Sequence, residues 1–563
     1  MLSIATTVFA QGCWTRETNI LPPIDSSTGQ ASPVADAHAQ RERRLGWLLF
    51  LLWFVVVALG TLRHEFWRDE VRAFTLARSA TSLTELFALL KDEGHPLLWY
   101  LLLHWGYAVT SSKLVLPLIS LAVAVAAVAI LILRSPLPLW LKALFVFGRM
   151  PLFECSVMAR NYGLSMLLLF TFAWLYREPR RHPIWMGVVL ACLANTNIHS
   201  LLLAGLLMSF WLWDELGRKR SPLASPAARG LYFAAMLLAA GAIAAVLTMW
   251  PSDQMVPSHP AQYTPWNVIG AIWSTLGDPA KQFGSIAPRL PGLVAVLINL
   301  IFIGSTLGLG GRPALLAVAW AAIFALSVLF TVVYAGGYRH QGLFIIFLLT
   351  LYWMDFEAGQ VLPSGRVASA LARAGRYFCL PALLVTSLVS GIYKVAMDVI
   401  HETSAGQSFG SYLEAHPEHK GAILIGEPDF YIESMPYYAD NPIYIVREQR
   451  FGDTVKFTRR AKLHLDLGKL LAEAWRIHAL ENREVLIALG HLKNLDPLSG
   501  GGDDSQPIRY SFGRTFSWSR EDLRSWQAST QFLARFADDV TGDERYAIYK
   551  VVAPPNKMVA PPL

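Results

Sequence analysis

Long apolar runs constrain this chain more than any other feature of its sequence. Residues 45–63, 114–133 and 230–250 each carry few charges, and about 20 apolar residues suffice to cross the hydrocarbon core of a bilayer. Of the 563 residues, 54% are hydrophobic and only 16% are charged. A soluble protein of this size exposes more polar surface to water. The sequence therefore predicts an α-helical polytopic membrane protein.

Basic residues between the runs predict their orientation. RERR (41–44) precedes the first run, so the positive-inside rule places the start of that run in the cytoplasm and residue 64 outside. The basic turn at 177–181 is also cytoplasmic by this rule, so an odd number of crossings must separate it from residue 64. Four candidate runs lie in that interval, so one of them does not span the membrane. The short runs 96–110 and 137–150 are the two candidates. We expect about eleven transmembrane helices and an extracytoplasmic C-terminal region.

The composition divides the chain into three parts. We predict a disordered cytoplasmic tail at 1–40, a transmembrane domain at 41–398 and an extracytoplasmic α/β domain at 399–563. The last part alternates apolar β-rich segments with helix-like ones, which is typical of a small α/β fold. The expected elements are strands at 421–432, 441–446, 483–490 and 545–553, helices at 461–480 and 520–540, and a mobile loop at 500–505.

The first outer loop, residues 64–95, is predicted to contain a helix of its own. Ser82 and Glu85 have the spacing of a capping box ahead of apolar residues at helical intervals. Gly94 and Pro96 end that pattern. We expect an amphipathic helix at the membrane surface. In a second outer loop, Thr264 and Pro265 mark another helix start.

Charge and cysteine content exclude several functions. The net charge of +7 is explained by basic cytoplasmic loops, so no nucleic-acid partner is predicted. The four cysteines have no zinc, haem or disulfide spacing. The predicted location is the inner (plasma) membrane, crossed many times, with the N-terminus in the cytoplasm.

Charged residues gather immediately beyond the first apolar run, in HEFWRDEVRAF (64–74). Asp69 and Glu70 are adjacent, so on a helix they point about 100° apart and do not form a paired-carboxylate dyad. Arg72 lies one turn from Asp69. A solvated charge cluster at a helix end is the ordinary interpretation. Carboxylates at a membrane face must, however, be hydrated, paired or functional.

Two further polar clusters are predicted on the same outer face. Arg160 and Tyr162 stand at the outer end of one apolar run, and Arg339 and His340 stand at the outer end of another. His95, ahead of Pro96, is often only a turn residue, and snorkelling alone explains many such arginines. Cations gathered at this depth suit a lipid-linked phosphate better than they suit core packing.

These residues resemble a known family. An Asp–Glu pair in the first outer loop, HP before an apolar helix and R-x-Y opening a later span are similar to polyprenyl-phosphate-dependent glycosyltransferases of the GT-C fold. The pattern is similar to the bacterial protein mannosyltransferase and aminoarabinose transferase group. The similarity covers about 45–355. Two positions depart from the family pattern, because Leu97 follows HP and Asn161 stands inside R-x-Y. These departures leave the identity of the sugar and of the acceptor open.

The resemblance implies roles for these residues. Asp69 matches the catalytic aspartate and Glu70 its neighbour, and both are predicted to be catalytic, with Glu70 positioning the acceptor or helping to bind a divalent ion. Arg160 and Tyr162, with Arg339 and His340 on the same face, are the predicted donor-phosphate site. Arg72 is expected to orient Asp69, and His95 to support the site.

The implied reaction moves a sugar from a polyprenyl-phosphate donor to an extracytoplasmic hydroxyl of a lipid, glycan or protein. Attack opposite the phosphate, with Asp69 as general base, inverts the anomeric centre. No cofactor is assigned, and a divalent metal ion beside Glu70 stays open because one carboxylate pair does not define a metal site. The alternative is a transporter or flippase of lipid-linked saccharides, although transporters usually place such charges near the midplane.

Overall fold

The structure is a computed structural model that describes residues 33–179, 181–218, 226–256, 264–278, 280–287, 292–490, 507–536 and 544–552. It divides into two compact units, residues 1–52 and 53–563. The described part of the first unit is the beginning of helix α2. The candidate functional site and its contacts lie within the second unit.

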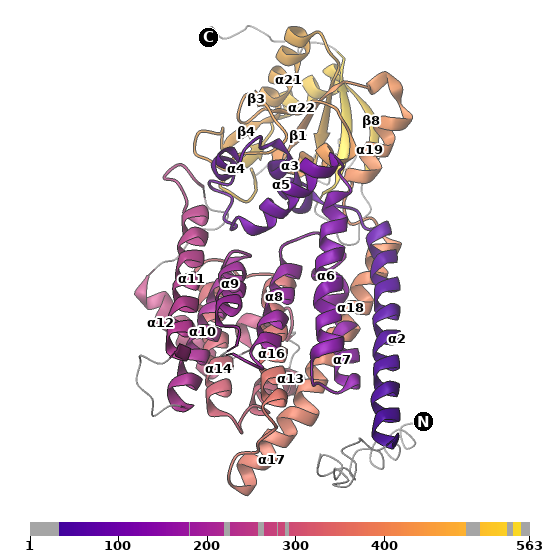
Figure 1. The fold of residues 1–563 in the computed structure, drawn as a ribbon. Helices are drawn as coiled ribbons and strands as arrows, with labels where there is room; N and C mark the ends of the chain where they lie inside the picture. Colours follow the sequence, from indigo (N-terminus) through magenta and orange to yellow (C-terminus); the bar gives the residue numbers. More distant parts are fainter. Residues whose placement is uncertain are drawn as a thin grey trace. The chain divides into compact units, whose positions relative to one another are not determined.

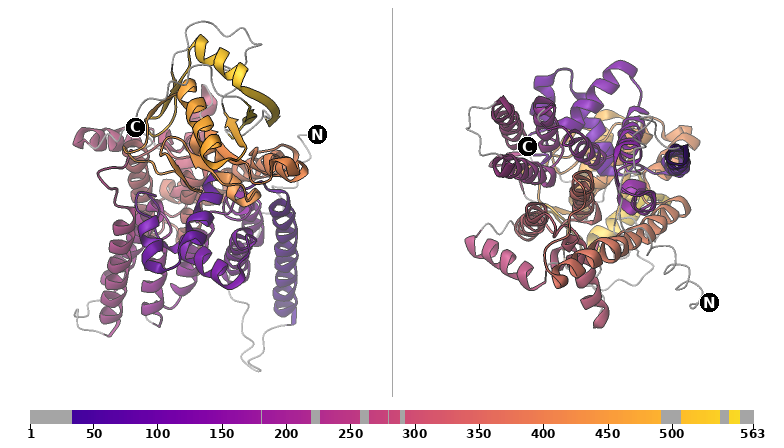
Figure 2. Two further views of the ribbon diagram at one scale, coloured as in Figure 1. Left: turned by 90° about the horizontal axis from the view of Figure 1, so that it is seen from above. Right: turned by 60° about the horizontal axis from the view of Figure 1, so that its bottom comes forward.

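Helices make up most of the chain up to residue 400 (Figure 1). Their bounds are α2 Pro33–Arg63, α3 Arg68–Ser79, α4 Leu83–Leu89, α5 Leu98–Thr110, α6 Val115–Arg134, α7 Leu139–Val146, η1 Met150–Glu154, α8 Tyr162–Leu175, α9 Pro183–Ala194, α10 Ile198–Arg218, α11 Pro226–Met249, α12 Pro265–Gly277, η2 Lys281–Phe283, α13 Leu293–Leu307, α14 Pro313–Val332, α15 Tyr338–Gln341, α16 Leu343–Glu357, α17 Arg366–Ala374, η3 Gly375–Cys379 and α18 Leu380–Ile400. Several of these helices are seen nearly end-on in the right panel of Figure 2.

Five helical segments of the described chain are long and apolar enough to cross a membrane. They are Gln40–Arg63, Val115–Arg134, Arg229–Met249, Pro313–Val332 and Arg366–Ile400. Shorter apolar helices are Tyr162–Leu175, Pro183–Ala194 and Leu293–Leu307. The doubtful runs 96–110 and 137–150 form α5, of 13 residues, and α7, of 8 residues. At about 1.5 Å per residue neither helix covers a core of about 30 Å. The total of about eleven spans stays a prediction.

Apolar side chains on the outer helices remain exposed. Met236 and Leu247 of α11, Leu297 of α13 and Val389 and Ile392 of α18 are all exposed. Large apolar side chains in such numbers face lipid in a membrane protein, because hydrocarbon tails solvate them as well as a protein core does. The predicted class of helical membrane protein is confirmed in this respect.

The first outer loop contains two helices, whereas the sequence predicted one. The predicted helix is α4, and the Ser82 hydroxyl accepts a hydrogen bond from the Glu85 N–H at 3.2 Å. The Glu85 carboxylate does not complete the capping box, because it accepts from the Thr81 N–H at 2.8 Å instead. The additional helix, α3, carries Asp69 and is buried along Val71, Phe74 and neighbouring residues.

The described part of the C-terminal region is a small α/β fold, as predicted. Strands β1, β5, β9 and β8 form one sheet in that order, with β1 and β5 parallel and the other pairs antiparallel. Smaller sheets pair β2 with β3 and order β4, β7 and β6. The bounds are β1 Ile423–Glu427, β2 Tyr444–Ile445, β3 Arg450–Phe451, β4 His464–Asp466, β5 Val485–Leu489, β6 Ile508–Arg509, β7 Thr515–Ser517, β8 Thr530–Phe536, β9 Tyr546–Val551, α19 Gly406–Ala415, η4 Pro417–His419, η5 Asp429–Ser434, α20 Met435–Tyr438, α21 Leu467–Glu481 and α22 Arg520–Ser529.

Four segment predictions need correction. The predicted strand 421–432 ends at Glu427, and Asp429–Ser434 form η5. The predicted helix 520–540 ends at Ser529, and residues 530–536 form β8, because pairing with β9 overrides the local helical pattern. The predicted helix 461–480 begins only at Leu467, where the Asp466 carboxylate accepts the Lys469 N–H at 2.7 Å. Helix α2 begins at Pro33, so residues 33–40 of the predicted disordered tail are helical. The predicted loop 500–505 lies outside the described residues.

The C-terminal domain and both outer loops meet in the second unit. In the first outer loop, the Arg68 N–H donates to the Glu544 carboxylate at 2.8 Å. In the second outer loop, the Val256 N–H donates to the Phe457 carbonyl at 2.8 Å. Asp92 of the first loop accepts from the Ser252 N–H at 2.6 Å. These contacts place both loops and the C-terminal domain on one side of the helical layer.

Candidate active site

Asp69 stands in the first turn of α3, with three arginines around it. Its carboxylate lies 3.3 Å from Arg339 Nη2, 3.7 Å from Arg160 Nη1 and 4.0 Å from Arg68 Nε. The Asp69 side chain is 32% exposed. Burial opposes ionisation, but Arg160, Arg339 and Arg68 outweigh it and lower the pKa of Asp69 to about 2. Residues more than ninety positions apart in sequence therefore form one charged site.

Arg160 contacts the carboxylate of Asp69, the main chain of Asp69 and the ring of His95. Its Nη1 donates to the main-chain oxygen of Asp69, and its Nη2 lies 3.4 Å from His95 Nε2. His95 Nδ1 lies 3.0 Å from the Glu93 carbonyl, so the ring proton belongs on Nδ1 and Nε2 accepts from Arg160. Burial, and then Arg160, lowers the pKa of His95 to about 4. His95 is thus a neutral group that orients Arg160, consistent with its predicted supporting role.

Arg339 reaches the site from α15, between α14 and α16. Its guanidinium lies over the Trp67 ring, 5.1 Å from the ring centroid, and Arg68 lies over the same ring at 5.3 Å. Arg339 Nε is buried without a hydrogen-bond partner among the described residues. The pairing of Arg339 with Asp69 therefore leaves donor capacity for a ligand.

Glu70 does not share the position of Asp69. It is fully buried, and its carboxylate accepts from the Ala159 N–H at 2.6 Å and lies 3.1 Å from His64 Nε2. The other ring nitrogen of His64 lies 2.8 Å from Asp398. The two neighbouring carboxylates point apart, as predicted, but a catalytic role for Glu70 is not supported by this arrangement. Glu70 instead fixes the backbone just before Arg160.

Arg72 does not orient Asp69, and that prediction is wrong. Its guanidinium pairs with Glu93 and with Glu433 of the C-terminal domain. Its central carbon lies 5.1 Å from the centre of the Phe457 ring. The sequence placed Arg72 correctly one turn after Asp69, but its partners come from segments that sequence spacing does not reveal.

His340 and Tyr162 are buried and pack against each other beside the arginines. The Gly337 N–H donates to His340 Nδ1 at 2.9 Å, so the ring proton is on Nε2, which meets the Tyr334 hydroxyl. Burial and Arg339 hold the pKa of His340 well below its usual range. His340 is therefore a neutral group and not the phosphate-binding cation we expected. The buried Tyr162 ring packs edge-on against it at 5.4 Å.

The side chains that contact Asp69 do not resemble a metal site. No group of three or more His, Cys, Asp or Glu side chains in the described segments is arranged to hold a metal ion. A metal requirement stays an open prediction.

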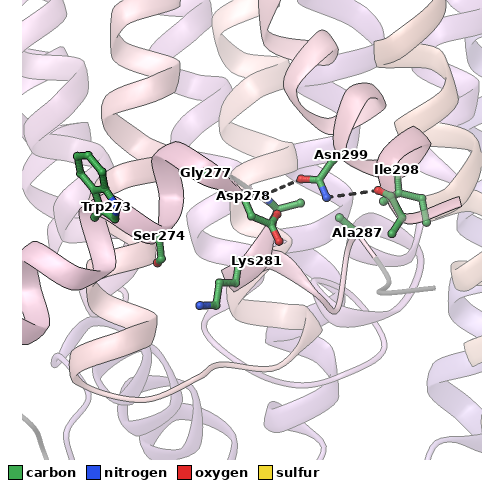
Figure 3. A pocket seen from close by; sticks show the side chains of 10 residues that line it. Trp273, Ser274, Gly277, Asp278, Lys281, Ala287, Ile298 and Asn299 are labelled. Carbon is green, nitrogen blue, oxygen red and sulfur yellow. Dashed lines mark hydrogen bonds between the residues drawn. The ribbon is translucent and has the colours of Figure 1, made fainter. Parts of the chain in front are cut away.

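A cavity of about 550 Å³ lies elsewhere, between α12, η2 and α13 (Figure 3). Its lining includes Trp273, Asp278, Lys281 and Asn299 and shares no residue with the Asp69 site. The Asn299 amide oxygen accepts from the Ala280 N–H at 3.3 Å. The cavity is therefore separate from the arginines around Asp69.

No family model and no curated protein sequence matches this chain. Solved structures similar to it include two crystal structures of one protein. One is the crystal structure of ArnT from Cupriavidus metallidurans bound to undecaprenyl phosphate, with a TM-score of 0.43 and 12% identity over 92% of this chain and 99% of that chain. The other is the apo state of the same protein, with a TM-score of 0.39 and 12% identity over 92% of this chain and 98% of that chain. Similarity at this level carries no argument about the site, so the role of the site must come from its own geometry.

Sequence reasoning missed three residues of this region. Trp67 lies beneath two arginines, Tyr334 meets His340, and His199 packs against the same ring. Trp67 stands next to Arg68 in the charged stretch, so that stretch contained its signal. Tyr334 precedes the Gly pair before Arg339 and was visible in the same way. His199 carried no such signal, because it begins an apolar run far from the other clusters.

Proposed function

We propose that this protein is a membrane glycosyltransferase. It moves a sugar from a polyprenyl-phosphate donor to an acceptor hydroxyl on the extracytoplasmic side of the membrane. One observation carries the proposal: Arg160 and Arg339 converge on a partly exposed aspartate beside apolar helices. Guanidinium groups bind phosphate through paired hydrogen bonds, and a carboxylate next to a bound phosphate is placed to accept a proton.

Asp69 acts as the general base in this proposal. The acceptor oxygen attacks the anomeric carbon, its proton passes to Asp69, and the bond from that carbon to the phosphate oxygen breaks. The electron pair leaves with the polyprenyl phosphate, whose growing charge Arg160 and Arg339 stabilise. Attack from the opposite face inverts the anomeric centre.

Donor binding prepares Asp69 for this step. With a pKa of about 2, the carboxylate is a weak base at neutral pH, because an effective base has a pKa close to the working pH. A phosphate bound to Arg160 and Arg339 neutralises the charges that hold this pKa down. The same event that places the sugar therefore raises the basicity of Asp69.

The test is a transfer assay on the full-length protein in proteoliposomes. The donors are undecaprenyl phosphate carrying radiolabelled mannose, glucose or 4-amino-4-deoxyarabinose, and label is counted in the lipid, glycan and protein fractions of added membranes. Asp69→Asn removes the base and should lower transfer about 10²–10⁴-fold. Asp453→Asn is the matched control, because this exposed aspartate pairs with Arg78 at 3.2 Å and lies outside the site.

Three outcomes contradict the proposal. They are unchanged transfer by Asp69→Asn, an equal loss in Asp453→Asn, and retention of the anomeric configuration in the product. Movement of the intact labelled donor across the bilayer by Asp69→Asn, without transfer, would favour the flippase alternative.

A further inference from the structure

His199 is a buried imidazole without a hydrogen bond to any residue that the structure describes. It is the second residue of α10, it is 3% exposed, and neither ring nitrogen has a partner in the described part of the chain. Buried polar groups in proteins are hydrogen-bonded in the large majority of cases, so an unpaired ring requires an explanation.

The hydrogen-bond network at the start of α10 does not include the His199 ring. Ser165 Oγ accepts from Asn197 Nδ2 at 2.9 Å and from Ser200 Oγ at 2.8 Å, and it lies 3.0 Å from Thr196 Oγ1. This network joins α8 to the start of α10 and satisfies its own members. His199 lies within the same segment but outside the network, so its position is fixed while its nitrogens stay free of protein partners.

The ring lies against the candidate active site. Its centroid is 5.1 Å from the His340 ring, 5.6 Å from Phe330 and 6.4 Å from Tyr334. His340 cannot pair with it, because both nitrogens of His340 are engaged by Gly337 and Tyr334. The rings packed against His199 are those of Phe330, Tyr334 and His340, and His340 also packs against Tyr162 of the candidate active site.

A neutral imidazole offers one donor and one acceptor. A phosphate oxygen only accepts in its ionised form, so it would leave one ring nitrogen unpaired. A sugar carries several hydroxyls that can donate or accept, so one can accept from the ring N–H and another can donate to the other ring nitrogen. Arg160 and Arg339 already supply the positive charge that binds a phosphate. Both arginines pair with the Asp69 carboxylate.

We propose that His199 binds a hydroxyl of the donor sugar and thereby contributes to sugar specificity. This inference rests on the proposed function. It assigns the phosphate to the arginines and the sugar to a residue of α10 that faces the ring of His340.

The test compares two lipids on each variant of the full-length protein in detergent. Native mass spectrometry measures the Kd of undecaprenyl phosphate and the Kd of undecaprenyl phosphate carrying mannose, glucose or 4-amino-4-deoxyarabinose. His199→Phe keeps an aromatic ring and removes both hydrogen-bonding groups. It should weaken the best-bound sugar lipid about tenfold and leave undecaprenyl phosphate unchanged.

Two further variants keep the test decisive. His199→Gln retains a donor and an acceptor and should restore sugar-lipid binding to within about threefold of the unmodified protein. His104→Phe is the control, because His104 lies on α5 with its ring nitrogen 2.9 Å from the Ala77 carbonyl. It should change neither Kd.

Equal weakening of both lipids, no change in either, or the same effect in His104→Phe overturns the inference. So does an unmodified protein that binds both kinds of lipid equally. A protein that shows the expected Kd pattern but transfers no sugar fails the proposed function alone.

Discussion

Two charged clusters in this protein each hold one aspartate among arginines, three around Asp69 and two around Asp355, and they lie at opposite ends of α14 and α16. Asp69 meets Arg339, which lies between the end of α14 and the start of α16. Asp355, near the end of α16, meets Arg312, just before α14, and Arg376 of η3. The two clusters differ in the exposure of the aspartate and in the lengths of their ion pairs.

The Asp355 carboxylate is saturated by its two arginines, although Arg376 Nε, like Arg339 Nε, has no hydrogen-bond partner among the described residues. Asp355 is fully buried and lies 3.1 Å from Arg312 Nε and 2.6 Å from Arg376 Nη2. The arginines also donate to main-chain oxygens, Arg312 to Gly359 at 2.9 Å and Arg376 to Gly308 at 2.9 Å. Such a group joins three helical segments and has little capacity for a ligand.

The Asp69 cluster is looser. Its shortest ion pair is 3.3 Å, Asp69 is partly exposed, and Arg339 Nε has no partner among the described residues. Composition alone therefore does not distinguish a structural cluster from a functional one. Exposure does, because a ligand must be able to reach the charged groups.

The largest expected effect is on stability. Asp355→Ala leaves a buried guanidinium unpaired and should reduce the free energy of unfolding by about 3–5 kcal/mol. Asp69→Ala removes a partly exposed partner and should change it by no more than about 1 kcal/mol. Denaturant unfolding of the purified protein in detergent measures both. Equal losses in the two variants would remove the distinction between the saturated and the looser cluster.

The next effect distinguishes Arg339 of the Asp69 cluster from Arg376 of the Asp355 cluster. Arg339→Gln removes a charged hydrogen-bond donor and should lower kcat/KM for the lipid-linked donor about 10–100-fold. Arg376→Gln should reduce the yield of folded protein but leave kcat/KM per folded molecule unchanged, because it lies at the other end of α16. Activity normalised to the folded fraction from gel filtration checks this. A loss of kcat/KM in Arg376→Gln alone would reverse the assignment.

The smallest effect, taken per pH unit, concerns a cluster of the opposite composition, one histidine between two carboxylates. Burial disfavours the charged ring, but Glu70 and Asp398 outweigh it and raise the pKa of His64 to about 10. The folded protein therefore holds a proton that the unfolded chain releases near pH 6.5. This stabilisation is complete below pH 6.5 and is lost as pH rises through 10, by at most about 1.4 kcal/mol per pH unit.

His64→Gln is the comparison for that pH effect. Its melting temperature is expected to be lower than that of the unmodified protein at pH 6 and to vary less between pH 6.5 and 10. Parallel melting curves across this range would show that His64 does not carry the charge assigned to it.

The sequence by itself determined the class of protein and the positions of most helices. Apolar runs, capping residues and Gly–Pro breaks are local signals, so α4 begins after Ser82 and α12 after Thr264 as predicted. Clusters at 69, 160 and 339 were predicted to share a face because orientation follows from basic residues between the runs. That they meet is confirmed by the ion pairs of Asp69.

Only the tertiary structure decided which partner each charged residue has. Arg72 pairs with Glu433 rather than with Asp69, and the Glu70 carboxylate accepts a hydrogen bond from the Ala159 N–H. Strand β8 stands where the end of a helix was predicted. Each outcome depends on a contact between segments far apart in sequence. The energy of such a contact depends on burial and geometry, and neither can be obtained from the order of residues along the chain.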